Sequence, residues 1–153
     1  MLEINDKAPD FQLSNQDDET VSLGDFAGEW LVLYFYPKDD TPGCTKEACD
    51  FTDGLPNFSA LNANVIGVSV DDTASHRKFI AKYNLPFRLV SDVDKKVLEA
   101  YGAWGEKKMY GKTYMGVVRS AFLIDEEGKI AATGYKISPK NTVPTLMKWL
   151  ADG

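Results

Sequence analysis

Two cysteines, Cys44 and Cys49, are the residues of this chain best suited to covalent chemistry. Just before them, Thr41 and Pro42 predict the start of a helix, because threonine suits the N-cap and proline the first helical position. Cys44 then falls in the first turn, where unbonded backbone N–H groups and the positive end of the helix dipole favour a thiolate. Thiolate is the nucleophilic form, so we predict that Cys44 is a nucleophile. The alternative is a cysteine that packs inertly against a sheet.

The spacing of the two cysteines predicts a rearrangement that is coupled to oxidation. Five positions along a regular helix separate two Cα atoms by roughly 8.7 Å, whereas a disulfide usually needs about 4.4–6.8 Å. Cys44 and Cys49 can therefore join only where the helix unwinds locally. For Cys49 the alternative is a small buried hydrophobic residue. Thr41 has two roles open to it, as a cap of the helix or as a hydrogen-bonding partner of whatever occupies a pocket beside Cys44.

Three further features of the sequence bear on function. Arg119 begins an apolar strand predicted at residues 118–124, and arginine is rarely buried unless it is paired, so an anionic partner such as a thiolate is expected. The alternative is an arginine at a sheet edge, in water. Residues 102–116 are rich in glycine and aromatics and are predicted to form a long loop, which either frames the pocket mouth, contacts a reductant or is a solvated surface. His76 is expected to be exposed, without a catalytic role.

The rest of the pattern predicts the elements that must position these side chains. A hairpin is expected over residues 10–23, and further strands over 30–36, 65–70, 87–90, 118–124 and 129–134. Helices are expected to begin near residue 41 and to cover 73–83, 93–101 and 142–151. In the third helix, Val93, Val97, Leu98 and Tyr101 are spaced to face a core. Alternating strands and helices, followed by a terminal hairpin and helix, predict an α/β fold on a mixed sheet.

Length and composition restrict the possible functions. The chain has 153 residues, which fits one domain over residues 1–153. Two cysteines and one histidine exclude a disulfide-rich scaffold, a four-cysteine zinc site and a multi-histidine metal centre. The net charge of −6 argues against a nucleic-acid binder, and it resides in the first 25 residues. No signal peptide or membrane-spanning run is evident, so a cytoplasmic protein without membrane contacts is expected.

The residues around the cysteines resemble a known family. The pattern Pro37-x-x-x-Thr41-x-x-Cys44 is similar to the active-site signature of peroxiredoxins, which are thiol peroxidases. The longer string from Tyr36 to Cys49 resembles the bacterioferritin comigratory protein branch, also called Q-type. Further similarity lies in residues 101–108, 111–119 and 122–125, so the resemblance covers essentially the whole chain.

The resemblance implies a role for each residue at the motif positions. Cys44 would be the peroxidatic cysteine, which attacks the peroxide O–O bond and becomes a sulfenic acid. Thr41 would hydrogen-bond the peroxide and the thiolate. Arg119 would hold the thiolate and polarise the peroxide, and Glu47 would help to orient this arginine. Pro37 would shield the site from water.

The resemblance also implies a catalytic cycle and a fold. Cys49 would be the resolving cysteine, which forms an intramolecular disulfide with Cys44, and thioredoxin or a glutaredoxin-type dithiol protein would reduce that disulfide. Hydrogen peroxide and organic hydroperoxides would be the substrates, in antioxidant defence, with no cofactor or metal. The fold would be thioredoxin-like, with a central mixed sheet flanked by helices and an N-terminal β-hairpin extension. Since resolution needs no second subunit, the cycle fits a monomer, and a dimer would serve equally.

Two other functions are compatible with a reactive cysteine pair. A general thiol–disulfide oxidoreductase is disfavoured by the four-residue spacer, because such enzymes favour Cys-x-x-Cys, and an insulin-reduction assay separates the two. A non-enzymatic redox sensor or chaperone would use the same helix unwinding to bind partners. It predicts slow peroxide turnover and a complex that depends on oxidation.

Overall fold

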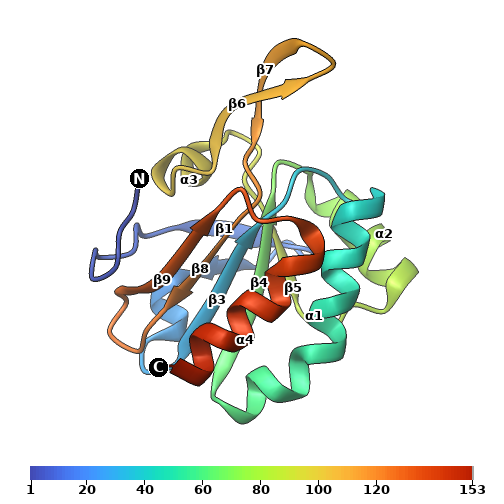
Figure 1. Cartoon of the computed structure of the whole chain (residues 1–153). Coiled ribbons are helices and arrows are strands. Elements are labelled where there is room, and N and C mark those ends of the chain that lie inside the picture. Colours follow the sequence, from blue (N-terminus) through green and yellow to red (C-terminus); the bar gives the residue numbers. More distant parts are fainter. Residues whose placement is uncertain (153) are drawn as a thin grey trace.

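A mixed sheet of seven strands forms the centre of the computed structural model, which describes residues 1–152 (Figure 1). Gly153, the last residue of the predicted domain, lies outside the described residues. The order across the sheet is β2-β1-β5-β4-β3-β8-β9. β3, β4 and β5 are parallel, and the other neighbours pair antiparallel. These strands are β1 (Gln12–Asn15), β2 (Thr20–Ser22), β3 (Trp30–Phe35), β4 (Ala63–Ser69), β5 (Arg88–Ser91), β8 (Ser120–Ile124) and β9 (Ile130–Tyr135).

Helices cover both faces of this sheet (Figure 1). One face packs against α1 (Pro42–Ala60), α2 (Thr73–Tyr83) and α4 (Thr142–Asp152), and the other against α3 (Lys96–Ala100) and the N-terminal segment. Two short 3-10 helices, η1 (Leu23–Phe26) and η2 (Pro139–Asn141), complete the connections. The predicted α/β class, mixed sheet and N-terminal hairpin are confirmed.

The strand β3 and the helix α1 create the setting for the cysteines. β3 lies between β4 and β8, so its apolar run is buried on both faces, as a central strand requires. The chain leaves β3, turns, and begins α1 with Thr41 as the N-cap residue and Pro42 in the first turn. Phe51 of α1 stacks on Tyr34 of β3 with ring centroids 4.3 Å apart. This contact fixes the middle of α1 against the sheet.

Two predictions about secondary structure are wrong. Residues 102–116 are not a loop, because β6 (Trp104–Met109) and β7 (Lys112–Val117) pair as an antiparallel hairpin that projects from the sheet (Figure 1). The turn, Tyr110-Gly111, has positive φ at both residues, as a two-residue hairpin turn requires. The helix predicted over 93–101 begins only at Lys96, so Val93 is 61% exposed instead of facing the core.

Candidate active site

Cys44 lies in the first turn of α1 and is buried, with 2% of its surface exposed. Backbone N–H groups of this turn have no helical acceptor, so they offer hydrogen bonds and a partial positive charge to an anion. The guanidinium of Arg119, which directly precedes β8, donates from Nη2 to Cys44 Sγ over 3.3 Å. Cys44 and Arg119 are 75 positions apart in sequence, and the sheet brings them together.

Arg119 also binds a buried carboxylate. Its Nη1 donates to Glu47 Oε1 over 2.6 Å, and the other oxygen, Oε2, accepts from the Thr142 hydroxyl over 2.6 Å. Glu47 and Thr142 are almost completely buried. The expected contact between Glu47 and Arg119 is therefore present. Thr142, at the start of α4, was not predicted as a site residue, because its only signal in the sequence was that of a helix start.

Burial and neighbouring charges have opposite effects on the pKa values of Glu47 and Arg119. Burial raises the pKa of Glu47 to about 7, against the opposing effects of Arg119 and Thr142. For Arg119, burial works to lower the pKa, but the charges of Glu47 and Cys44 outweigh it, so the pKa is raised and the guanidinium stays charged. A permanent cation thus faces the buried Sγ of Cys44.

Thr41 occupies the N-cap position, but its side chain makes no capping hydrogen bond. Its hydroxyl donates instead to the carbonyl of Lys38 over 2.8 Å. Pro37 directly follows Tyr36 and is half-buried. Cys49 lies on the same helix as Cys44, also partly buried, and both cysteines are free. The intact helix with two free thiols matches the arrangement that the spacing predicts for the reduced chain.

The prediction that His76 is an exposed residue is wrong. The histidine is completely buried, and its Nδ1 lies 2.7 Å from Asp39 Oδ2. The sequence around it, Ser75-His76-Arg77, carries no apolar signal. Burial here comes from a partner 37 positions away, which no local pattern reveals.

A cavity of about 640 Å³ opens beside Arg119. It is walled by the β6–β7 hairpin on one side and by the end of β9 and the following residues on the other. Its lining is Glu106, Lys107, Lys108, Val118, Arg119, Lys136, Ile137 and Ser138. Burial, followed by the charge of Arg119, lowers the pKa of Lys107, while Cys44 opposes this effect. The hairpin therefore borders the hollow that leads to Arg119.

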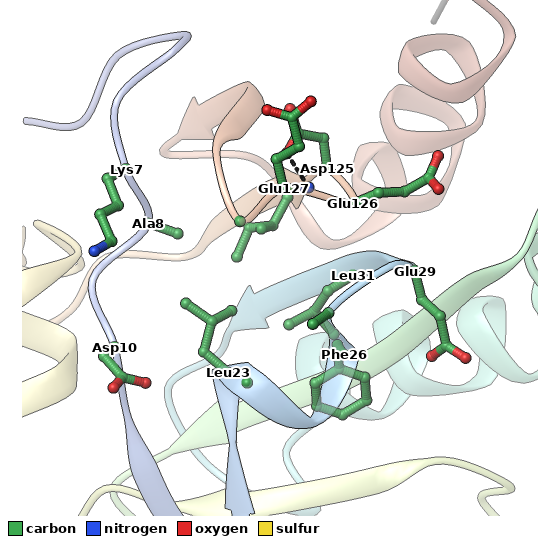
Figure 2. A pocket seen from close by; sticks show the side chains of 14 residues that line it. Lys7, Ala8, Asp10, Leu23, Phe26, Glu29, Leu31, Asp125, Glu126 and Glu127 are labelled. Carbon is green, nitrogen blue, oxygen red and sulfur yellow. Dashed lines mark hydrogen bonds between the residues drawn. The ribbon is translucent and has the colours of Figure 1, made fainter.

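A second cavity, of about 280 Å³, lies at the opposite end of β3 (Figure 2). Its lining includes Leu23 and Leu31, and carboxylates such as those of Glu126 and Glu127 stand at its rim. It includes none of the residues that surround Cys44. Over residues 1–152, no group of three or more His, Cys, Asp or Glu side chains is placed to hold a metal ion. Within the same range, no helix is long and apolar enough to cross a membrane.

Comparison with known proteins agrees with this geometry. Residues 4–133 match the model of the AhpC/TSA family. The chain is 49% identical over 151 residues to Peroxiredoxin Bcp of Bacillus subtilis, which covers 99% of this chain and 96% of that protein. It is 41% identical over 151 residues to Peroxiredoxin Bcp of Escherichia coli, with 99% and 97% covered.

Solved structures give the same result. The bacterioferritin comigratory protein of Xanthomonas campestris superposes with a TM-score of 0.88 at 39% identity, covering 93% of this chain and 90% of that one. A PrxQ of Xylella fastidiosa gives a TM-score of 0.93 at 35% identity, covering 99% and 97%. The chain therefore belongs to the AhpC/TSA family, with a thioredoxin-like fold, and is a peroxiredoxin, a thiol-dependent peroxidase that acts on hydroperoxides. Within the family its relatives are of the bacterioferritin comigratory protein, or Q-type, branch.

Proposed function

We propose that Cys44 is the peroxidatic nucleophile of this peroxidase and that Cys49 resolves it. The contact that carries the proposal is the hydrogen bond from Arg119 Nη2 to Cys44 Sγ, 3.3 Å long, at the first turn of α1. A guanidinium and free backbone N–H groups stabilise negative charge on sulfur, and the thiolate is the form that attacks.

The first step is attack of the Cys44 thiolate on the terminal oxygen of a hydroperoxide. An S–O bond forms and the O–O bond breaks, so the sulfur is oxidised and the peroxide is reduced. The departing oxygen takes a proton and leaves as water or an alcohol, while Cys44 becomes a sulfenic acid. Arg119 faces both the sulfur and the cavity, so its charge also opposes the negative charge that develops on the oxygens.

Thr41 and Pro37 flank this step in the proposal. Because the Thr41 hydroxyl donates its hydrogen bond to the Lys38 carbonyl, its oxygen is available as an acceptor for the O–H of the hydroperoxide. Pro37 follows the buried end of β3 and is half-buried, so it limits the access of water from that side. In these roles both residues orient the peroxide rather than supply protons.

Resolution requires the thiolate of Cys49 to attack the sulfenic sulfur of Cys44. An S–S bond forms, the S–O bond breaks, and the departing hydroxide takes a proton and leaves as water. Both cysteines lie on one unbroken helix, and five helical positions hold their Cα atoms roughly 8.7 Å apart, too far for a disulfide. The start of α1 must therefore unwind. A dithiol protein, thioredoxin or a glutaredoxin-type reductant, then reduces the disulfide through a mixed disulfide.

The substrates are proposed to include alkyl hydroperoxides as well as hydrogen peroxide. The Xanthomonas campestris relative is described by its alkyl peroxide reduction activity. In this chain the cavity beside Arg119 contains the apolar side chains of Val118 and Ile137 and, at about 640 Å³, has room for an alkyl group. A cytoplasmic location and a single domain over residues 1–153 stay predictions from the sequence.

Peroxide-dependent turnover with a thioredoxin system tests the assignment. We expect Cys44→Ser to abolish turnover and to leave no protein sulfenic acid. Cys49→Ser should still react with one equivalent of peroxide, but should not turn over with thioredoxin at the wild-type rate. Wild-type turnover by Cys44→Ser would overturn the nucleophile assignment. Normal turnover by Cys49→Ser, without a mixed disulfide, would overturn the resolving role.

A further inference from the structure

A buried ionic cluster lies directly upstream of the peroxidatic helix. Asp39, in the turn between β3 and α1, directs its carboxylate to α2, and its side chain is 4% exposed. Oδ1 accepts from the Tyr36 hydroxyl over 2.5 Å. Oδ2 accepts from the Ser75 hydroxyl over 2.8 Å and lies 2.7 Å from His76 Nδ1. The peroxidase mechanism proposed above uses neither Asp39 nor His76.

The hydrogen bonds define the proton on the imidazole ring. Nε2 of His76 lies 3.1 Å from the carbonyl of Val90, which can only accept, so Nε2 carries a proton. Burial raises the pKa of Tyr36 far above its ordinary value, so the Tyr36 hydroxyl keeps its proton and donates to Asp39. Asp39 thus accepts from two hydroxyls, and its Oδ2 shares a short hydrogen bond with Nδ1 of His76. His76 and Asp39 form a buried hydrogen-bonded pair.

This pair helps to fix the turn between β3 and α1, from which the peroxidatic helix starts. The backbone N–H of Asp39 donates to Asp71 Oδ2 over 2.8 Å, so side chain and main chain are both anchored. Downstream, α1 begins without a side-chain cap and without an acidic residue in its first turn. Gly43 leaves no room for a side chain, since an added Cβ would lie 3.0 Å from Pro139 and 3.3 Å from Arg119 Nη2. The position of Cys44 thus depends on the turn before the helix as well as on the contacts that Cys44 and Glu47 make with Arg119.

We propose that His76 is a positioning residue for the peroxidase reaction: through Asp39 it anchors the turn before α1 and so holds Cys44 against Arg119 in the reactive, helical arrangement. It acts through another residue, because its ring contacts Asp39 and Val90 and does not contact the reacting sulfur. The proposal rests on the assignment of Cys44 as nucleophile. It separates the two chemical steps, since attack on peroxide needs the anchored arrangement and disulfide formation needs its release.

The test measures both steps in His76→Gln. The first rate constant is that of sulfenic acid formation with hydrogen peroxide in a Cys49→Ser background, followed by trapping and mass spectrometry. The second is that of disulfide formation with both cysteines present, measured at peroxide concentrations high enough that the rate no longer depends on peroxide. We expect the ratio of the first to the second to fall at least tenfold, because a displacement of about 1 Å costs on the order of 10² in rate. A smaller change overturns the proposal, as does an equal loss in both steps.

Controls make the result specific. Lys78 lies exposed on the same helix, α2, so Lys78→Met should keep the ratio within twofold. A tenfold fall there would overturn the proposal, since it would assign the effect to α2 in general. Where His76→Gln does not fold, the double variant Asp39→Asn with His76→Gln replaces both buried side chains by amides. The same tenfold criterion applies to it.

A spectroscopic signature provides an independent readout. In the reduced protein, the nitrogen-15 resonance of His76 Nδ1 should shift when Asp39 is replaced in Asp39→Asn, and an unchanged resonance would overturn the proposal. The kinetic measurements also distinguish failure of the proposed function from failure of the anchor. If wild-type Cys44 forms no sulfenic acid, the proposed function fails, whereas a normal Cys44 with an unchanged rate ratio in His76→Gln refutes the anchor alone.

Discussion

At the residue scale, Arg119 serves two acidic groups at once. One guanidinium nitrogen faces Cys44 Sγ and another faces Glu47, whose second oxygen is held by Thr142. Only a planar, forked cation satisfies both directions, because an ammonium is a point charge without fixed geometry. Glu47 therefore orients Arg119, and Arg119 places its positive charge beside Cys44 Sγ.

Replacement of the Arg119 guanidinium by an ammonium tests this geometry. We expect Arg119→Lys to lower the second-order rate constant with peroxide by about 10²- to 10³-fold, which is typical of losing one preorganised donor at a developing anion. Stopped-flow measurement of Cys44 oxidation gives the rate constant. Arg77→Lys is the control, since Arg77 is exposed and binds the Gln16 carbonyl far from the site. A rate within threefold of wild type for Arg119→Lys would contradict the role.

The raised pKa of Glu47 predicts a pH dependence of stability. Burial raises it to about 7, above the usual value near 4.5, so the folded state holds this proton more tightly than the unfolded chain. The stabilisation is complete below about pH 4.5 and is lost as pH rises to about 7, at about 1.4 kcal/mol per pH unit, or about 3 kcal/mol in all.

Glu47→Gln cannot ionise at this position. Urea unfolding of both proteins at several pH values isolates the effect, because other groups cancel in the difference. The unfolding free energy of wild type, relative to Glu47→Gln, should fall between pH 4.5 and 7 and stay level above. A relative stability that grows with pH across this range would show that the ion pair with Arg119 outweighs burial.

At the element scale, α1 combines a weak start with a firm middle. Its first turn has no side-chain cap, whereas Phe51 is fully buried and stacked on Tyr34. Unwinding can therefore proceed from the N-terminal end to Cys49 and stop before Phe51. The free-energy cost of this unwinding includes removal of Glu47 from its buried position between Arg119 and Thr142.

Far-ultraviolet circular dichroism measures this unwinding. Oxidation to the Cys44–Cys49 disulfide should remove about two turns of helix, the length from Pro42 to Cys49. Cys49→Ser treated with one equivalent of peroxide reaches the sulfenic acid alone and should keep its helical signal. An unchanged spectrum in a fully disulfide-bonded sample would refute the coupling between oxidation and unwinding.

The β6–β7 hairpin carries a strained turn that can be relieved. Tyr110 has a φ of 53°, is 96% exposed and precedes Gly111, where φ is 76°. Asparagine tolerates this conformation better than tyrosine and is favoured before glycine in such turns. Tyr110→Asn should therefore stabilise the hairpin by about 1 kcal/mol, and amide exchange in β6 and β7 should slow several-fold. Equal or faster exchange would contradict the strain.

The same hairpin shows where the sequence is a poor guide. Strands β3 and β4 and helix α2 were predicted because their apolar runs or spacings reflect burial, whereas the start of α1 was predicted from Thr41 and Pro42. β7 is largely exposed, and the described side chains of β6 are half-buried or exposed, so no apolar alternation marks the two strands. Tyr-Gly is also a weaker turn signal than Asn-Gly. Cys44 was predicted as a nucleophile from helix-start chemistry and from the family resemblance. His76 and Thr142 were missed because their partners, Asp39 and Glu47, lie 37 and 95 positions away.

At the scale of the whole molecule, two cores lie on opposite faces of one sheet, and the centre of β4 has no space to spare. An added Cβ at Gly67 would lie 2.8 Å from both Leu89 Cδ2 and the Tyr34 ring. Tyr34 in turn supports Phe51, so the packing at β4 reaches the helix that carries the cysteines. Packing changes in the sheet are therefore transmitted through Tyr34 and Phe51 to the helix that carries the cysteines.

Gly67→Ala should therefore destabilise the protein by about 1–3 kcal/mol, as overpacking of a core does. Urea unfolding gives the value. Gly24→Ala is the matched control, because a Cβ there meets nothing within 4 Å. Equal stability of the two variants would show that the Tyr34 ring yields without cost.

The separation of the site residues along the chain has a consequence for newly made protein. Cys44 meets Arg119 across 75 positions, and Glu47 meets Thr142 across 95. Contacts of such long range close only when the fold does. An unfolded or nascent chain therefore carries an ordinary thiol at Cys44. Sensitivity to peroxide arises with folding, which spares unfinished molecules from oxidation before Cys49 and a reductant can repair it.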